Sequence, residues 1–247
     1  MSPQPPVMDM STYPGGEKSL AGISLRAFVI GVTLGVSVCL TIVVCPFTSL
    51  WRVPFFLASL SLFHFLEYYV TARYNTRYAS VSAFLLTSNG WAYNAAHTSA
   101  VVECIVASCL FPDSYTTWTA PVYGVKVHVV VGVVLMVLGQ MVRTVAMAQA
   151  GSNFNHTVQV EHKEGHRLVT SGVYRLFRHP SYFGFFWWGL GTQLVLGNVV
   201  CFAVYAVVLW RFFHSRIERE ERFLVLFFGD EYRNYKQHTW VGIPGII

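Results

Sequence analysis

Residues 180–210 read PSYFGFFWWGLGTQLVLGNVVCFAVYAVVLW, a run that contains no charged side chain. A single membrane-spanning helix needs about 20 apolar residues, so this run is too long for one simple span. The dipeptide Gly197-Asn198 interrupts it and is typical of a turn. We therefore expect a hairpin of two short helices, about Ser181–Leu196 and Val199–His214, each near the lower limit for crossing a bilayer.

Four more apolar stretches precede this hairpin, at about residues 24–44, 53–71, 83–111 and 122–148. Each is long enough to cross a bilayer, and a Pro112-Asp113-Ser114 break follows the third. The sequence therefore predicts an all-α integral membrane protein with about six transmembrane helices, the last two forming the C-terminal hairpin.

The composition of the 247 residues agrees with this prediction. Hydrophobic residues make up 54% and charged residues 12%, against about 25% charged residues in an average soluble domain. These proportions exclude a disordered chain and argue against an ordinary soluble enzyme. The net charge of +5 does not indicate nucleic-acid binding, because the basic residues lie between the apolar stretches.

The distribution of Lys and Arg predicts the orientation in the membrane. With a cytosolic N-terminus and six crossings, 15 of the 17 basic residues fall on the cytosolic side, and only Arg52 and Lys126 on the other. We expect three regions: a flexible tail (1–19), the N-terminal membrane helices (20–150), and a cytosolic-face region that includes the hairpin 181–214 (151–247).

Two groups of polar residues in the last region are candidates for a site. In Arg178-His179-Pro180, the proline fits the first turn of a helix, whose unpaired N–H groups can bind an anion. A basic anchor at the membrane interface would have the same residues. Arg216 and Glu220 lie four residues apart on one helical face, which also describes an ordinary surface pair on an amphipathic helix over 211–223.

Metal and nucleotide motifs give no alternative site. His162 and His166 have helical spacing, but Gly165 between them and the lack of a third ligand argue against zinc. The sequence contains neither a P-loop nor a dinucleotide-binding glycine motif after a strand. We therefore expect no metal, and a cofactor pocket of another design.

Several motifs, taken in order, resemble the isoprenylcysteine carboxyl methyltransferase family. They are GSNFNH (151–156), LVTSGVY (168–174), RHPSY (178–182), Glu220-Glu221, FGDEYRNY (228–235) and, in the second apolar stretch, SLSLFH (59–64) followed by Glu67. The resemblance covers about residues 20 to 245. The RHPxY motif with a downstream Glu-Glu is shared with phospholipid methyltransferases, whereas the SNFNH segment (152–156) and the motif of the second apolar stretch are more specific.

The resemblance implies an enzyme of the endoplasmic reticulum membrane with its active site facing the cytosol. It would transfer a methyl group from S-adenosylmethionine to the C-terminal carboxylate of farnesylated or geranylgeranylated cysteine in processed CaaX proteins. Arg216 would hold the substrate carboxylate and act with Glu220 as catalytic residues. The cofactor would be bound by Gln159, His166, Arg167, Leu168, Val169, Tyr174, His179, Pro180, Ser181, Tyr182 and Glu220.

The chemistry separates this function from its alternatives. A C-terminal carboxylate has a pKa of about 3.5 and is ionised at pH 7, so it can accept a methyl group without a general base. A phospholipid N-methyltransferase, the main alternative, must remove a proton from an amine. A sterol reductase with a nicotinamide cofactor is a more distant enzyme alternative. A membrane transporter or structural membrane protein, the non-enzyme alternative, would be expected to carry mid-membrane charges in several spans. Here only Glu67, Glu103 and His64 qualify, and packing residues with satisfied partners would look the same. Glu220 could orient Arg216 or attract the cationic cofactor.

Overall fold

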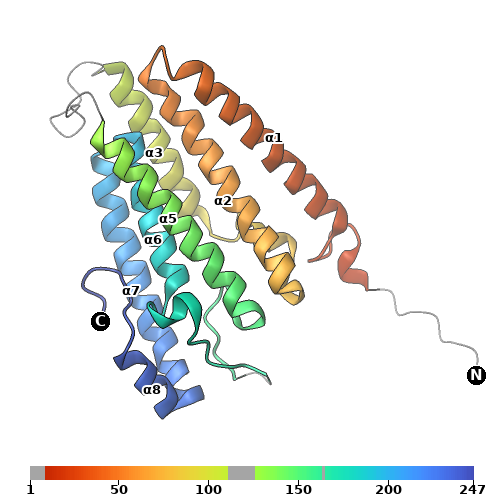
Figure 1. Cartoon of the computed structure of the whole chain (residues 1–247). Coiled ribbons are helices and arrows are strands. Elements are labelled where there is room, and N and C mark those ends of the chain that lie inside the picture. The colour runs from red at the N-terminus through yellow and green to blue at the C-terminus, as the bar shows by residue number, and fades with distance from the viewer. Residues whose placement is uncertain (1–8, 111–125, 163–164) are drawn as a thin grey trace, which may run out of the picture.

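The computed structural model describes residues 9–110, 126–162 and 165–247, and six long helices form a bundle in these ranges (Figure 1). They are α1 (Leu20–Val44), α2 (Arg52–Tyr74), α3 (Trp91–Leu110), α5 (Val127–Ala150), α6 (Pro180–Leu196) and α7 (Val200–Phe228), followed by the short α8 (Asp230–Gln237). Turns of 3-10 helix are η1 (Met10–Thr12), η2 (Ser49–Trp51), η3 (Thr76–Tyr78), η4 (Val81–Phe84), η5 (Gly151–Asn153) and η6 (Gly172–Arg175).

The described residues confirm the prediction of an all-helical fold with helices suited to a membrane. Four segments within the described ranges are long and apolar enough to cross a bilayer: Leu20–Val44, Ser49–Tyr74, Val127–Asn153 and Val200–Phe228. In Figure 1, α1 lies at one edge, and α7 and α8 extend beyond the bundle at the end where α5 finishes and α6 begins. Of the expected tail, residues 9–19 carry η1, and the Glu17 carbonyl accepts a hydrogen bond from Val81 N at 2.8 Å.

Two predicted helix boundaries are wrong. The third helix begins at Trp91 rather than near Ala83, because Leu85, the residue after η4, adopts the left-handed conformation (φ 56°) and Gly90 also has a positive φ. The last helix does not stop at His214 but continues through Phe228, so the amphipathic segment 211–223 is part of α7. The predicted break at 112–114 and the predicted start near Val122 lie outside the described residues.

Glycines set the close packing of α5 against α6. Gly132 and Gly139 of α5 lie against Gly191 and Gly184 of α6. A Cβ added to Gly139 would lie 2.5 Å from the Gly184 carbonyl oxygen, and one added to Gly132 would lie 2.7 Å from the Gly191 carbonyl oxygen. The heptad spacing on both helices keeps these glycines on one facing stripe. This close approach brings the C-terminal half of α5 next to the first turn of α6.

Two of the charged residues in the helices have structural partners. Glu103 of α3 accepts hydrogen bonds from the N–H groups of Val199, Val200 and Cys201 at 2.7–2.9 Å, so it caps the start of α7. Arg52 of α2 donates to the Leu196 carbonyl at 2.7 Å at the end of α6. These pairs fix the turn of the hairpin and leave the opposite end of the bundle to the candidate site.

Candidate active site

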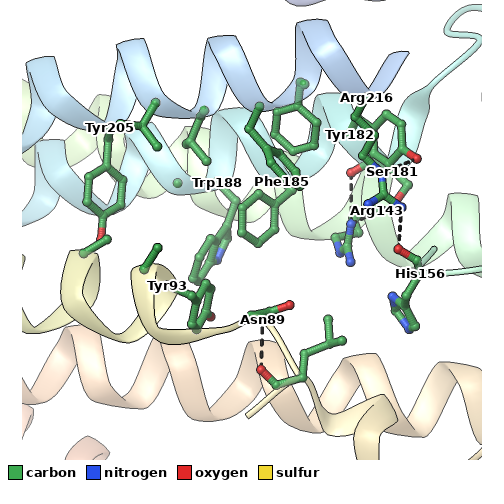
Figure 2. Close-up of a pocket in the computed structure, with 18 of the residues that line it drawn as sticks. Asn89, Tyr93, Arg143, His156, Ser181, Tyr182, Phe185, Trp188, Tyr205 and Arg216 are labelled. Carbon is green, nitrogen blue, oxygen red and sulfur yellow. Dashed lines mark hydrogen bonds between the residues drawn. The ribbon is translucent and has the colours of Figure 1, made fainter. Parts of the chain in front are cut away.

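An apolar cavity of about 350 Å³ lies among α3, α6 and α7 (Figure 2). Arg143, His156 and Arg216 gather at one end of it, whereas Tyr205 lies at the other. Aromatic and aliphatic side chains line the space between these ends, among them Phe185, Trp188, Val204, Val208, Leu209, Phe212 and Phe213. The cavity thus has a charged end and a long apolar body.

A smaller, more polar pocket of about 110 Å³ adjoins the charged end of the cavity. Ten of the eleven predicted cofactor residues line it: His166, Arg167, Leu168, Val169, Tyr174, His179, Pro180, Ser181, Tyr182 and Glu220. The eleventh, Gln159, lines a neighbouring pocket of about 60 Å³ that shares His166 and Glu220 with it. The chain therefore brings residues from 150 to 235 around one polar space.

The first turn of α6 joins the two spaces, because Ser181 and Tyr182 line both of them. Pro180 occupies the first helical position and His179 the N-cap, so residues 181 and 182 follow at the open end of the helix. The imidazole of His179 stacks on the Tyr182 ring at a centroid distance of 5.5 Å. A group held in the polar pocket therefore lies beside the charged end of the cavity.

Tyr182 connects Arg216 to Glu220. The Arg216 Nε donates to the Tyr182 hydroxyl at 2.7 Å, and that hydroxyl donates to Glu220 Oε2. The guanidinium carbon also lies 5.2 Å from the centroid of the Tyr182 ring. The Nη2 of Arg216 donates to the carbonyl oxygen of His156. The two residues predicted as catalytic are thus brought together, with a tyrosine hydroxyl between them.

Glu221 lies behind the polar pocket and holds two of the residues that line it, Arg178 and His179. It accepts from Arg178 Nε at 2.7 Å and from Lys236 Nζ at 2.5 Å, and it lies 3.3 Å from His179 Nε2. Two polar atoms there are buried without a hydrogen-bond partner in the described part of the chain: Arg178 Nη2 and the Tyr232 hydroxyl. Both residues line the pocket, so two donors remain for a polar ligand.

The ion pair of Arg143 and Glu67 was not predicted as part of the site. Arg143 Nε and Nη2 contact the two carboxylate oxygens of Glu67 at 2.5 and 2.8 Å, and Nη1 donates to Ser181 Oγ at 2.8 Å. Both side chains are buried. The signal in the sequence was one acid and one arginine in separate apolar stretches, since a charge inside a membrane needs a partner.

His156 is a neutral group beside two arginines. Burial is the main cause that lowers the pKa of its imidazole; the nearby carboxylate of Glu67 raises it, the positive charges of Arg143 and Arg216 lower it, and together these effects bring the pKa to about 4. At pH 7 the ring therefore carries no charge. Its Nε2 is buried without a partner among the described residues, next to the charged end of the cavity.

The chain is similar to known proteins both in sequence and in fold. Residues 130–226 match the family described as isoprenylcysteine carboxyl methyltransferase. The chain is 43% identical over 243 residues to the protein-S-isoprenylcysteine O-methyltransferase of Saccharomyces cerevisiae, covering 96% of this chain and 97% of the relative. The human protein of that name is 41% identical over 225 residues, covering 91% and 75%. A solved structure of the eukaryotic intramembrane Ras methyltransferase of this kind is similar with a TM-score of 0.81 at 34% identity, covering 91% of this chain and 77% of the other.

Proposed function

We propose that this chain, which belongs to the isoprenylcysteine carboxyl methyltransferase family, methylates the C-terminal carboxylate of prenylated cysteine in processed CaaX proteins, with S-adenosylmethionine as the methyl donor. The observation that carries this proposal is the shared wall of Ser181 and Tyr182 between a polar pocket and an apolar cavity. A polar cofactor and a prenyl chain could then meet at one place.

The residues of the polar pocket fit S-adenosylmethionine. The unpartnered donors of Arg178 and Tyr232 suit a carboxylate or an adenine ring, and Glu220 places a carboxylate near a cationic ligand. When bound, the cofactor supplies a methyl group activated by a sulfonium. We propose that the eleven predicted residues, from Gln159 to Glu220, hold it.

Arg216 is proposed to hold the substrate carboxylate at the charged end of the cavity. A guanidinium has five N–H donors in a planar fork, and the bonds to Tyr182 and His156 engage only two of its three nitrogens. The carboxylate is already ionised at pH 7, so these residues need to orient it and exclude water rather than remove a proton. Glu220 accepts a hydrogen bond from the Tyr182 hydroxyl, which in turn accepts from Arg216, and it also lines the polar pocket, so these contacts support either of the two alternative roles for it.

The membrane topology is proposed from the fold and the charges together. We propose that all six long helices enter the bilayer of the endoplasmic reticulum and that the tail 1–19 and the two charged segments 151–179 and 211–247, which flank the hairpin, lie on the cytosolic face. The count of 15 basic residues against 2 supports this orientation. The site would then lie where a cofactor arrives from the cytosol, and the helices 20–150 would form most of the scaffold.

A methylation assay tests this function. The purified protein in lipid vesicles is given labelled S-adenosylmethionine with either N-acetyl-S-farnesylcysteine or phosphatidylethanolamine. We expect label in a base-labile ester of the prenylcysteine only. Label in the lipid alone would identify the N-methyltransferase alternative, which the relatives above do not favour. Label in neither substrate would contradict the proposed function.

A further inference from the structure

A second apolar cavity lies beside α1, at the edge of the bundle (Figure 1). Its volume is about 700 Å³, within the range of about 300–1,000 Å³ that is typical of ligand pockets. It is lined by α1, α2 and residues 86–98. Tyr93 and His97 line both this cavity and the one that contains Arg216, so they form the wall between the two. The proposed reaction does not use the space beside α1.

This cavity is open toward the surrounding bilayer and is confined to one leaflet. Its lining residues Leu25, Val29 and Leu57 are 40–62% exposed. Along α1 the lining runs from Arg26 to Thr33, and seven residues of helix cover about 10 Å. One leaflet supplies about 15 Å of hydrocarbon, half of the bilayer core. The cavity thus has the depth of a lipid chain rather than of a helix that crosses both leaflets.

Arg26 gives the cavity a positive charge near the start of α1. It lies six residues after Leu20, the first residue of this helix. Its Nη1 donates to the Gly22 carbonyl oxygen at 3.0 Å, so the side chain runs back toward the N-terminal end of α1. No carboxylate pairs with this guanidinium in the ranges that the structure describes. A charge at the edge of the hydrocarbon needs a counter-charge, and a lipid phosphate supplies one.

The wall that α2 contributes suits hydrocarbon, because its polar side chains already have partners. Ser61 Oγ donates to the Leu57 carbonyl oxygen at 2.8 Å. The two ring nitrogens of His64 lie 2.8 Å from the Phe84 carbonyl oxygen and 3.2 Å from the Tyr93 hydroxyl. The other lining residues of α1 and α2 are mainly aliphatic: Leu25, Val29, Ile30, Leu57 and Leu60.

We propose that this cavity binds an anionic phospholipid of the cytosolic leaflet, with its phosphate on Arg26 and one acyl chain between α1 and α2. The proposed orientation places the start of α1 in that leaflet, which is also the one that carries anionic lipids. One basic residue near the membrane surface should favour an anionic over a zwitterionic lipid about fivefold. Lipid binding needs no methyl transfer, so it can be tested apart from the proposed function.

Photo-crosslinking in vesicles tests this site. The full chain is reconstituted in phosphatidylcholine with a trace of phosphatidylserine that carries a diazirine in the upper half of one acyl chain, and peptide mass spectrometry locates the label. We expect label in residues 25–33 and 57–64, and Arg26→Gln should reduce it about fivefold. A phosphatidylcholine probe with the same diazirine should label these residues about fivefold less than the phosphatidylserine probe.

Two matched controls separate the site from general effects of charge and size. Arg77→Gln removes the same charge from an exposed residue of η3 outside the cavity and should leave the label within twofold. Val29→Trp fills the cavity with Arg26 intact and should reduce the label in 57–64 at least threefold, whereas Phe28→Trp, beside it and outside the lining, should not.

Equal labelling by the two probes would overturn the proposal, and so would label that Arg26→Gln leaves unchanged. Label that excess N-acetyl-S-farnesylcysteine displaces would also overturn it, because the occupant would then be a prenyl chain. If Arg26→Gln does not fold, the comparison of the two probes on the wild type, together with Val29→Trp, decides. Each of these results leaves the methylation assay and its outcome unchanged.

Discussion

Replacing Glu67 by Gln should destabilise the protein more than any single change at an exposed acid. The substitution keeps the size of the side chain and removes the charge that neutralises Arg143. Glu67 is 1% exposed and Arg143 8%, so the guanidinium cannot turn to water. Removing one partner of a buried ion pair costs about 3–5 kcal/mol. At about 2–4 °C per kcal/mol for a chain of this size, the melting temperature should fall by roughly 6–20 °C.

Thermal unfolding of the purified protein in detergent measures this effect. Glu218→Gln is the matched control, because Glu218 lies on the outside of α7 with its side chain 56% exposed, and it should change the melting temperature by less than about 1 °C. Glu67→Leu combined with Arg143→Met removes both charges and should recover most of the lost stability. The reasoning fails if Glu67→Gln melts with the control, or if the double variant is less stable than Glu67→Gln.

Three further outcomes are expected at the site and its scaffold. His179→Ala removes a buried partner of Glu221 in the proposed cofactor pocket, so calorimetry should show S-adenosylmethionine binding weakened about tenfold or more; equal binding would make His179 an interfacial anchor. The pKa of His156 lies below its unfolded value of about 6.5, so its contribution to stability is complete above pH 6.5 and is lost as the pH falls toward about 4. Between pH 7 and 5 the free energy of unfolding of the wild type should fall by about 2 kcal/mol because of this group, and thermal melts of His156→Gln should show a smaller fall. Equal falls would contradict the lowered pKa of His156. Gly139→Leu places a side chain against the Gly184 carbonyl and should abolish cooperative unfolding or lower the melting temperature by more than 10 °C, whereas Gly35→Leu, at a position open around its Cβ, should not.

The helices could be predicted from the sequence because each apolar stretch is interrupted by charges or by a turn. The ends of the helices are harder to predict, because the local backbone conformation sets them. Leu85 adopts a left-handed backbone conformation that no pattern of residues predicts, and α3 therefore begins later than the apolar stretch that contains it. The segment after His214 is amphipathic, and this pattern fits a separate surface helix as well as a continuation of α7.

The motifs predict which residues share the polar pocket, but no motif predicts the ion pairs and hydrogen bonds between distant helices. The motif residues lie in one region of the chain, and their order along it carries the resemblance. Glu67 and Arg143 are 76 residues apart, and Glu103 and Val199 are 96 residues apart. The sequence shows Glu67, Arg143 and Glu103 as charged residues within apolar stretches, but only the packing of the helices shows which partner each one contacts. Tyr182 likewise gains its bridging role from the spacing between α6 and α7.

The central claim is that Arg216 holds the substrate carboxylate on the cavity side of Tyr182. The most direct test measures both turnover and cofactor binding of the Arg216→Lys variant. Lysine keeps the positive charge and loses the planar fork. With N-acetyl-S-farnesylcysteine, turnover should fall by about 10²-fold because the carboxylate is no longer oriented. The dissociation constant of S-adenosylmethionine, measured by calorimetry on the same preparation, should stay within twofold of the wild type. Unchanged turnover, or cofactor binding weakened as much as turnover, would contradict the account.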